Sequence, residues 1–256
     1  MAIAPTAEPF FSAAVPDAHD GQRVGALLVR GFTGSPASMR PWGQYLAGQG
    51  IGVAVPRLPG HGTTWQECNR TRWADWYGEV ERSFEKLAAE CDQVVVAGLS
   101  MGGSLVLQLA ADRGREVAGV VLVNPAVHTE RKDVLALPVL KHLVGSFPGI
   151  ANDIKKEGVE EHGYTKTPLK AIHSFMQAWP VIIADLPKIT APLLYFRSTE
   201  DHVVDDASQP LITNGVSSRD VTVLPLENSF HVATIDHDAP QIFAESADFI
   251  ARVAAS

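Results

Sequence analysis

The chain has few of the features that mark disulfide-rich, metal-binding, nucleic-acid-binding or membrane-spanning proteins. It contains two cysteines, Cys68 and Cys91, which are too few for a disulfide framework and lack the spacing of a metal site. Lys and Arg number 21 against 29 Asp and Glu, and they form no basic run that would suit a nucleic acid. No segment is long and apolar enough to span a bilayer, and residues 1–5 lack the parts of a signal peptide. These absences favour a cytoplasmic protein that uses no metal.

Short apolar runs alternate with amphipathic segments of helical length along most of the 256 residues. Such alternation is typical of an α/β fold with a mostly parallel central sheet and helices on both faces. We expect strands at 25–29, 51–55, 93–97, 117–123, 193–196 and 221–224, and helices at 39–48, 73–89, 105–113 and 240–253. The length and the 46% hydrophobic content predict one large core, and therefore a single domain over residues 1–256.

The alternation stops between residues 125 and 187, where helical pieces are separated by prolines and glycines. We expect a small helical cap insertion there. Its first half carries more large apolar residues than a solvent-facing connection needs. It is either a helix packed on the sheet or a lid whose inner wall holds an acyl chain, and one helix can serve both purposes.

A serine lies in a glycine-rich turn between a predicted strand and a predicted helix. The sequence Gly98-Leu99-Ser100-Met101-Gly102 has the G-x-S-x-G spacing of a nucleophile elbow, which presents a serine hydroxyl at the carboxyl edge of a sheet. A phosphate-binding turn is the alternative, but the chain lacks the spacings that are specific for it. The sequence therefore predicts Ser100 as a nucleophile.

A serine alcohol needs a base within hydrogen-bond reach and a carboxylate that orients the base. In hydrolases with this elbow the acid and then the histidine follow the serine along the chain. Asp201 follows the fifth predicted strand and His231 follows the sixth, so we predict them as acid and base. Two alternatives stay open: Asp201 as a helix cap, and Asp236 with His237 as the acid and base.

Negative charge that develops on a carbonyl oxygen needs donors fixed in advance. The backbone N–H of Met101, directly after the serine, is one predicted donor. The second is expected in the loop after the first central strand, from the N–H of Phe32, where Gly31 allows a close approach.

Five motifs carry a resemblance to known proteins along nearly the whole chain. They are Arg30-Gly31-Phe32-Thr33-Gly34-Ser35-Pro36, Pro59-Gly60-His61-Gly62-Thr63, Gly98-Leu99-Ser100-Met101-Gly102-Gly103, Glu200-Asp201-His202-Val203-Val204 and Asn228-Ser229-Phe230-His231-Val232-Ala233-Thr234. The chain resembles the bacterial monoacylglycerol lipases and the thermostable Bacillus-type carboxylesterases, which have the α/β-hydrolase fold.

The resemblance implies the same roles for the five residues chosen above and adds two contacts from the cap. The stretch around Glu161 is similar to the one in which these lipases hold a glutamate that binds glycerol hydroxyls, and Ile150 matches a residue of the pocket wall on the alcohol side. A solvated surface charge is the alternative for Glu161.

Two positions depart from the family pattern: Arg30 replaces a loop histidine, and Phe230 replaces the tyrosine that usually precedes the base. Arg30 could pair with an acid and preserve the loop, bring positive charge toward an anionic substrate, or spoil the oxyanion hole.

With this resemblance we expect a serine ester hydrolase that releases a fatty acid and glycerol from monoacylglycerol, without a cofactor and with a transient contact to a lipid surface. The alternatives are a carboxylesterase that acts on other small esters and a catalytically weak ligand-binding relative.

Overall fold

The computed structural model describes residues 7–16, 18–19, 21–149 and 152–255. Its centre is a seven-stranded sheet with the strand order β1-β3-β2-β4-β5-β8-β9, parallel except for the edge strand β1. The strands are β1 (Phe10–Ser12), β2 (Val24–Val29), β3 (Gly52–Val55), β4 (Gln93–Leu99), β5 (Val117–Val123), β8 (Leu193–Ser198) and β9 (Val221–Leu226). The central strands β2 and β4 are buried almost throughout, because helices cover both faces of the sheet.

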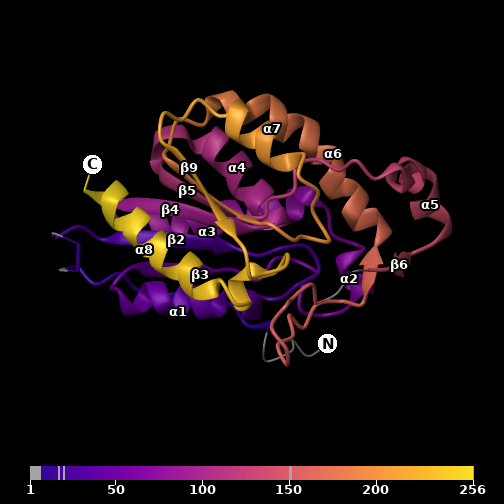
Figure 1. The fold of residues 1–256 in the computed structure, drawn as a ribbon, viewed down its shortest axis with the longest axis horizontal. Helices are drawn as coiled ribbons and strands as arrows, with labels where there is room; N and C mark the ends of the chain where they lie inside the picture. The colour runs from indigo at the N-terminus through magenta and orange to yellow at the C-terminus, as the bar shows by residue number, and fades with distance from the viewer. Residues whose placement is uncertain (1–6, 17, 20, 150–151, 256) are drawn as a thin grey trace.

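A layer of helices covers each face of the sheet (Figure 1), and a hydrophobic core lies between each layer and the sheet. Helices α1 (Arg40–Gly48) and α8 (Ala239–Ala254) cover one face, where Trp42 and Phe249 are buried. Helices α3 (Trp73–Ala88), α4 (Met101–Arg113) and α7 (Ser208–Gly215) lie on the other face. Along β4, alternate side chains enter the two cores, as the two-residue period of a strand requires.

Residues 125–187, here called the β5–β8 segment, leave the sheet after β5 and return to it at β8. The segment contains the helices α5 (Leu137–Leu143) and α6 (Leu169–Asp185) and a two-stranded antiparallel sheet of β6 (Ser146–Pro148) and β7 (Lys166–Pro168). Helix α5 and strand β6 project at one end of the molecule (Figure 1). In the described part of the chain, no helix combines the length and the apolar character needed to cross a membrane.

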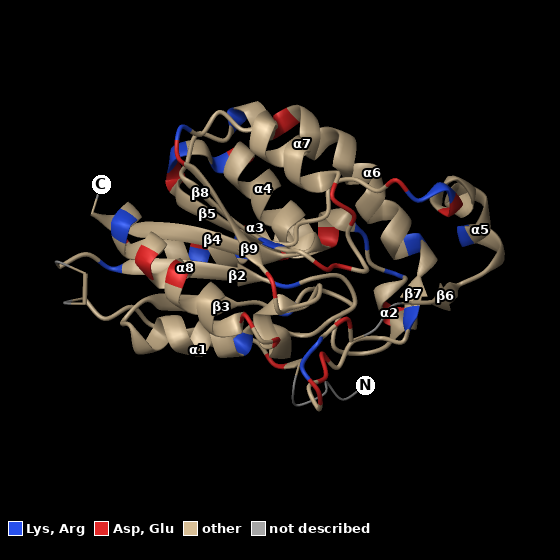
Figure 2. Ribbon diagram, viewed as in Figure 1, with Lys and Arg blue, Asp and Glu red and all other residues tan. Residues whose placement is uncertain are grey.

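The predicted mostly parallel α/β architecture is confirmed, and the six predicted strands are all present within two residues. Not predicted from the sequence were the edge strand β1, the short helix α2 (Trp65–Cys68), helix α7, and the strands β6 and β7 within a segment expected to be helical. Helix α4 begins at Met101 and not at residue 105, because the serine turn leads directly into it. Lys and Arg residues are interspersed with Asp and Glu over the fold (Figure 2).

Candidate active site

Ser100 occupies a strained turn between the central strand β4 and helix α4. Its φ of 55° and ψ of −119° lie outside the regions that a serine ordinarily adopts. The backbone holds this conformation: the Ser100 N–H donates to the Val123 carbonyl at 3.0 Å, and the Ser100 carbonyl accepts from Gly103 N–H at 2.9 Å. The structure therefore places Ser100 in the sharp strand-to-helix turn that the sequence predicted.

The glycines around the turn are required by close packing of backbone against backbone. A Cβ at Gly98 would overlap the backbone of Gly102, and a Cβ at Gly102 would overlap the backbone of Val29. Gly31 faces the serine directly, since a Cβ there would lie 3.2 Å from the Ser100 Cβ. The loop after β2 is thus held against the serine turn.

The two predicted oxyanion donors lie on this junction of β2 and β4, whose ends are paired through Val29 and Gly98. Among the described residues, neither the Phe32 nor the Met101 N–H has a hydrogen-bond partner. The Phe32 ring packs edge-on against His61 and Trp76, with ring centroids 6.0 and 5.8 Å away.

Asp201 and His231 come together at the ends of the neighbouring strands β8 and β9. His231 Nδ1 lies 2.9 Å from Asp201 Oδ2. Asp201 also accepts from the N–H groups of Val203 and Val204, both at 2.9 Å, and from Arg197 Nη1 at 2.9 Å. The loop amides and Arg197 fix the carboxylate, so the imidazole has one preferred orientation.

The pKa values of this pair follow from burial opposed by charge. Burial alone would raise the pKa of Asp201, but the His231 charge and hydrogen bond and the two loop amides outweigh it and lower that pKa to about 2. Burial alone would lower the pKa of His231, but the Asp201 charge and hydrogen bond, with help from Glu161 and Asp153, raise it above its usual value. Asp201 is therefore ionised at neutral pH and stabilises a protonated imidazole.

Ser100 and His231 line the same cavity of about 700 Å³ between the sheet edge and the β5–β8 segment. That volume is typical of small-molecule sites. Most of the wall is apolar and comes from the β5–β8 segment. Its large apolar members are Val134, Leu137, Leu140, Phe147, Leu169, Ile172, Phe175, Met176 and Trp179.

Glu161 is 9% exposed and lines this cavity, so it is no solvated surface charge. Its backbone N–H donates to Asn152 Oδ1 at 2.9 Å, and in the described chain its carboxylate has no hydrogen-bond partner. Burial raises the pKa of Glu161, against the opposing charges of Arg30 and His231. The other residue implied by the resemblance, Ile150, lies outside the described residues.

Arg30, the first residue of the loop after β2, is fully buried. Its Nη1 donates to the Gly31 carbonyl at 2.9 Å, while Nε and Nη2 are buried without a partner in the described part of the chain. Burial lowers its pKa to about 10, partly offset by the Glu161 charge, so the guanidinium stays charged at neutral pH. The predicted pairing of Arg30 with an acid is not present, because no carboxylate among the described residues lies within 4.0 Å of the guanidinium, and the hydrogen bond to the Gly31 carbonyl ties Arg30 to the loop instead.

Asp153, a residue of the β5–β8 segment, makes two contacts that were not predicted from the sequence. Its Oδ2 accepts from the His231 N–H at 3.1 Å, and its Oδ1 lies 2.7 Å from His202 Nδ1. The His231 carbonyl accepts from Asn124 Nδ2 at 2.9 Å. Both backbone groups of the candidate base are therefore held, and no sequence signal links residue 153 to residue 231.

The alternative dyad of Asp236 and His237 does not form. The Asp236 carboxylate accepts backbone N–H groups of Lys155, Lys156, Phe230 and His237, and no bond to the His237 ring occurs within the described residues.

Residues 23–238 match the family described as serine aminopeptidase, S33. The chain belongs to this family. It is 38% identical over 248 residues to the thermostable monoacylglycerol lipase of Bacillus sp. (strain H-257), a match that covers 95% of this chain and 97% of that protein. It is 26% identical over 230 residues to a carboxylesterase of Bacillus subtilis (strain 168), covering 89% and 92%.

A solved structure from work on two metagenome-derived lipolytic enzymes, LipS and LipT, superposes with a TM-score of 0.92. It is 39% identical, and the match covers 98% of this chain and 100% of that one. Together with the S33 match, these similarities confirm the predicted resemblance, the α/β-hydrolase fold and the assignment as a serine hydrolase.

Proposed function

We propose that the protein hydrolyses monoacylglycerols through an acyl-Ser100 intermediate. The observation that carries the proposal is one cavity that combines a strained serine, an Asp201-bound histidine, an apolar wall and the buried carboxylate of Glu161, which has no hydrogen-bond partner among the described residues. The similarity to a monoacylglycerol lipase over nearly the full chain supports it.

In the proposed reaction His231 removes the proton from Ser100 while the oxygen attacks the ester carbonyl. Asp201 orients the imidazole and stabilises its protonated form. The N–H groups of Phe32 and Met101 bind the oxyanion, an interaction whose loss costs about 3 kcal/mol for one donor. His231 then protonates the departing glycerol, and water releases the fatty acid by the same steps in reverse.

The proposed selectivity comes from two parts of the cavity wall, one apolar and one carrying a carboxylate. The segment 125–187 acts as a cap whose apolar side chains enclose the acyl chain. Glu161 accepts hydrogen bonds from the glycerol hydroxyls, and Arg30 favours its ionised form. A buried acceptor without a partner disfavours esters that offer no hydroxyl in return.

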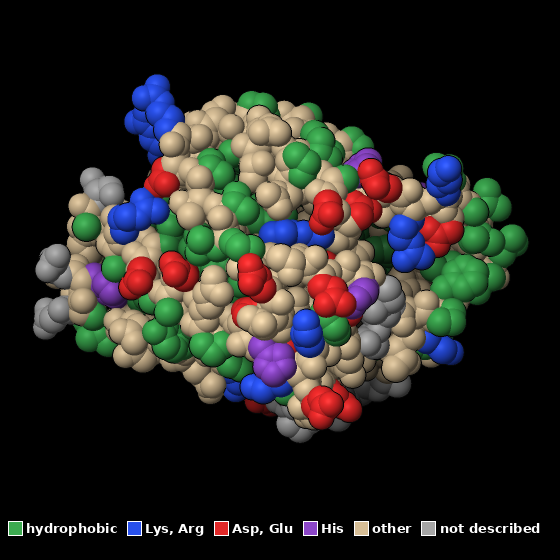
Figure 3. All heavy atoms as spheres, in the orientation of Figure 1, with side chains coloured by type: hydrophobic (Ala, Val, Ile, Leu, Met, Phe, Trp, Pro, Cys, Tyr) green, Lys and Arg blue, Asp and Glu red, His purple; other side chains and the backbone are tan. Residues whose placement is uncertain are grey.

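The cap also offers a surface for transient contact with lipid. Hydrophobic side chains gather over the end of the molecule that carries α5 and β6 (Figure 3). The exposed ones are Leu135, Val139, Leu143, Val144 and Phe147. Such a patch suits an interface where water-insoluble esters collect.

A cytoplasmic location would keep the free thiols of Cys68 and Cys91 reduced.

Hydrolysis of mono-, di- and trioleoylglycerol and of a short p-nitrophenyl ester tests the proposal, with Ser100→Ala as the inactive control. We expect the highest kcat/KM for the monoacylglycerol, and labelling of Ser100 by a fluorophosphonate. A preference for simple esters would favour the carboxylesterase alternative, which the similarity to the Bacillus subtilis carboxylesterase supports. Absence of both turnover and label would identify a ligand-binding relative.

A further inference from the structure

A second cavity, of about 170 Å³, lies on the far side of helix α6 from the substrate cavity. Residues 169, 172, 175, 176 and 179 of α6 line the large cavity, whereas 170, 173, 174 and 177 line the small one. At 3.6 residues per turn these two sets lie on opposite faces of the helix. On helix α5, Leu137 and Leu140 line the large cavity, whereas Lys141 and His142 line the small one.

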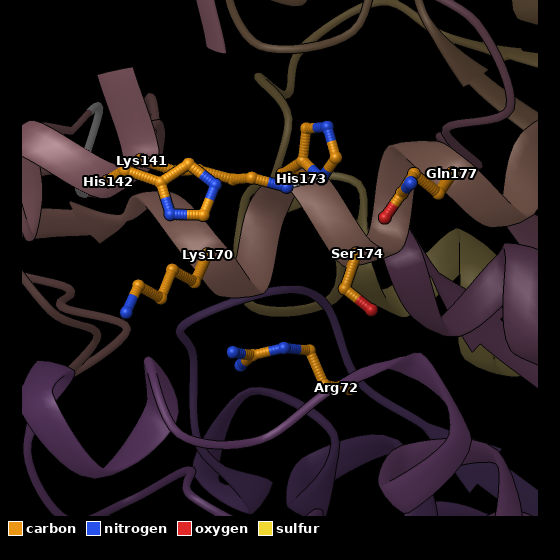
Figure 4. A pocket seen from close by; sticks show the side chains of 7 residues that line it. All are labelled: Arg72, Lys141, His142, Lys170, His173, Ser174 and Gln177. Carbon is orange, nitrogen blue, oxygen red and sulfur yellow. Dashed lines mark hydrogen bonds between the residues drawn. The ribbon is translucent and has the colours of Figure 1, made fainter. Parts of the chain in front are cut away.

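The small cavity is basic although the chain carries a net charge of −8. Arg72, Lys141, His142, Lys170 and His173 line it, together with a serine and a glutamine, and none of its lining residues is acidic. Figure 4 shows the side chains coming from three places: the loop before α3, helix α5 and helix α6. The Asp75 carboxylate accepts from the backbone N–H of Arg72 at 2.8 Å, so this contact does not use the Arg72 guanidinium.

Two donors of this cavity are held in place by the protein. Arg72 Nη1 donates to the carbonyls of Asn69 and Thr71 at 2.9 and 2.7 Å, which leaves Nε and Nη2 without partners among the described residues. Ser174 Oγ accepts from the Trp73 N–H at 3.1 Å, so its hydroxyl hydrogen remains free to donate. A ligand would therefore meet donors that lose little freedom on binding.

Lys141 and His173 form a contact between two basic groups. Lys141 Nζ lies 3.0 Å from His173 Nδ1, and because an ammonium group only donates, the imidazole nitrogen accepts. Burial and the Lys141 charge lower the pKa of His173, and the neighbouring His142 acts in the same direction. An anion in the cavity would offset the repulsion that these groups otherwise share.

We propose that this cavity binds the phosphate-monoester group of a ligand. Three permanent cations and two imidazoles match a dianion better than the single charge of a carboxylate, and a tetrahedral phosphate presents oxygens to all three lining elements. The volume accommodates a phosphate with a small substituent. Because α5 and α6 also form walls of the substrate cavity, a bound phosphate would tie both helices to the loop at Arg72. This site is independent of the proposed ester substrate.

Calorimetric titration of the whole protein with inorganic phosphate and glycerol phosphate, at constant ionic strength, tests the site. We expect Lys141→Gln and Lys170→Gln each to weaken binding about ten- to a hundredfold, as for the loss of a charge-assisted hydrogen bond. The control Lys132→Gln removes the same charge from the cap outside the cavity lining and should bind as the unmodified protein does.

Imidazole NMR supplies a readout that does not depend on the variants: phosphate should raise the pKa of His173, and chloride at equal ionic strength should not. Sedimentation with vesicles then distinguishes a lipid source from a free one, since phosphatidic acid presents a phosphate monoester and phosphatidylcholine does not. No phosphate binding at millimolar concentration, unchanged binding by both lysine variants, or an equal effect of chloride would each overturn the proposal.

Discussion

Replacing Gly34 by alanine is expected to displace the carboxylate of Glu161 without touching the candidate triad. Gly34 belongs to the loop after β2, and a Cβ there would overlap Glu161 Oε1 and lie 3.2 Å from Arg30 Nη1. The overlap is with the far end of a flexible side chain, so the loop itself can stay in place while the carboxylate moves.

The size of the effect follows from that geometry. Ordinary contact with a Cβ begins at 3.4 Å. To reach it the Glu161 carboxylate must shift by roughly 1 Å, a misplacement that can cost about a hundredfold in rate when the displaced group positions substrate. We therefore expect kcat/KM for monoacylglycerol to fall about ten- to a hundredfold in Gly34→Ala, and kcat/KM for a short alkyl ester to change little.

The assay is the ratio of these two kcat/KM values, measured for Gly34→Ala and for the matched variant Gly163→Ala. Gly163 lies two residues from Glu161, and a Cβ there would make only ordinary contacts, the nearest at 3.5 Å to the Thr33 carbonyl oxygen. An unchanged ratio in Gly34→Ala, or an equal fall in Gly163→Ala, would refute the role given to Glu161.

Three further predictions concern the catalytic pair and the serine turn. Because Asp201 raises the pKa of His231 and the base must be neutral, kcat/KM should fall as the pH drops, with a midpoint above pH 6.5; a pH–rate profile with a midpoint at or below 6.5 would contradict this. Asp153→Asn weakens the hydrogen bond to the His231 N–H, so kcat should fall about tenfold. It also removes a charge that favours protonated His231, so the acid midpoint of the pH–rate profile should move to lower pH. An unchanged kcat and an unchanged profile would exclude a positioning role for Asp153. Gly102→Ala forces a Cβ into the Val29 backbone and should destabilise the fold by about 3 kcal/mol or more, seen as a lowered Tm; an unaltered Tm would show that the turn relaxes.

The parts of the site that lie at strand ends could be predicted from the sequence, because local patterns determine them. The elbow glycines identify Ser100, and the apolar runs before Asp201 and His231 place both at the carboxyl edge of the sheet. The edge strand β1 was missed because three residues carry too little periodicity. Arg197 and Asp153 could not be found in the same way. Their contacts to Asp201 and His231 depend on how strand β8 and the β5–β8 segment pack against the loops that carry these two residues.

Asp153 lines the cavity and also holds the backbone of the candidate base. Asp153 holds the His231 N–H, and Asp236, on the loop after β9, holds the N–H groups of Lys155 and Lys156. The β5–β8 segment is thus joined to the loop of the candidate base through two buried carboxylates that accept hydrogen bonds from backbone N–H groups. Because the 152–161 stretch carries both Glu161 and Asp153, a movement of this stretch would displace part of the cavity wall and the contact to the His231 N–H together. We therefore expect the orientation of the candidate base to depend on the position of the same stretch that lines the cavity.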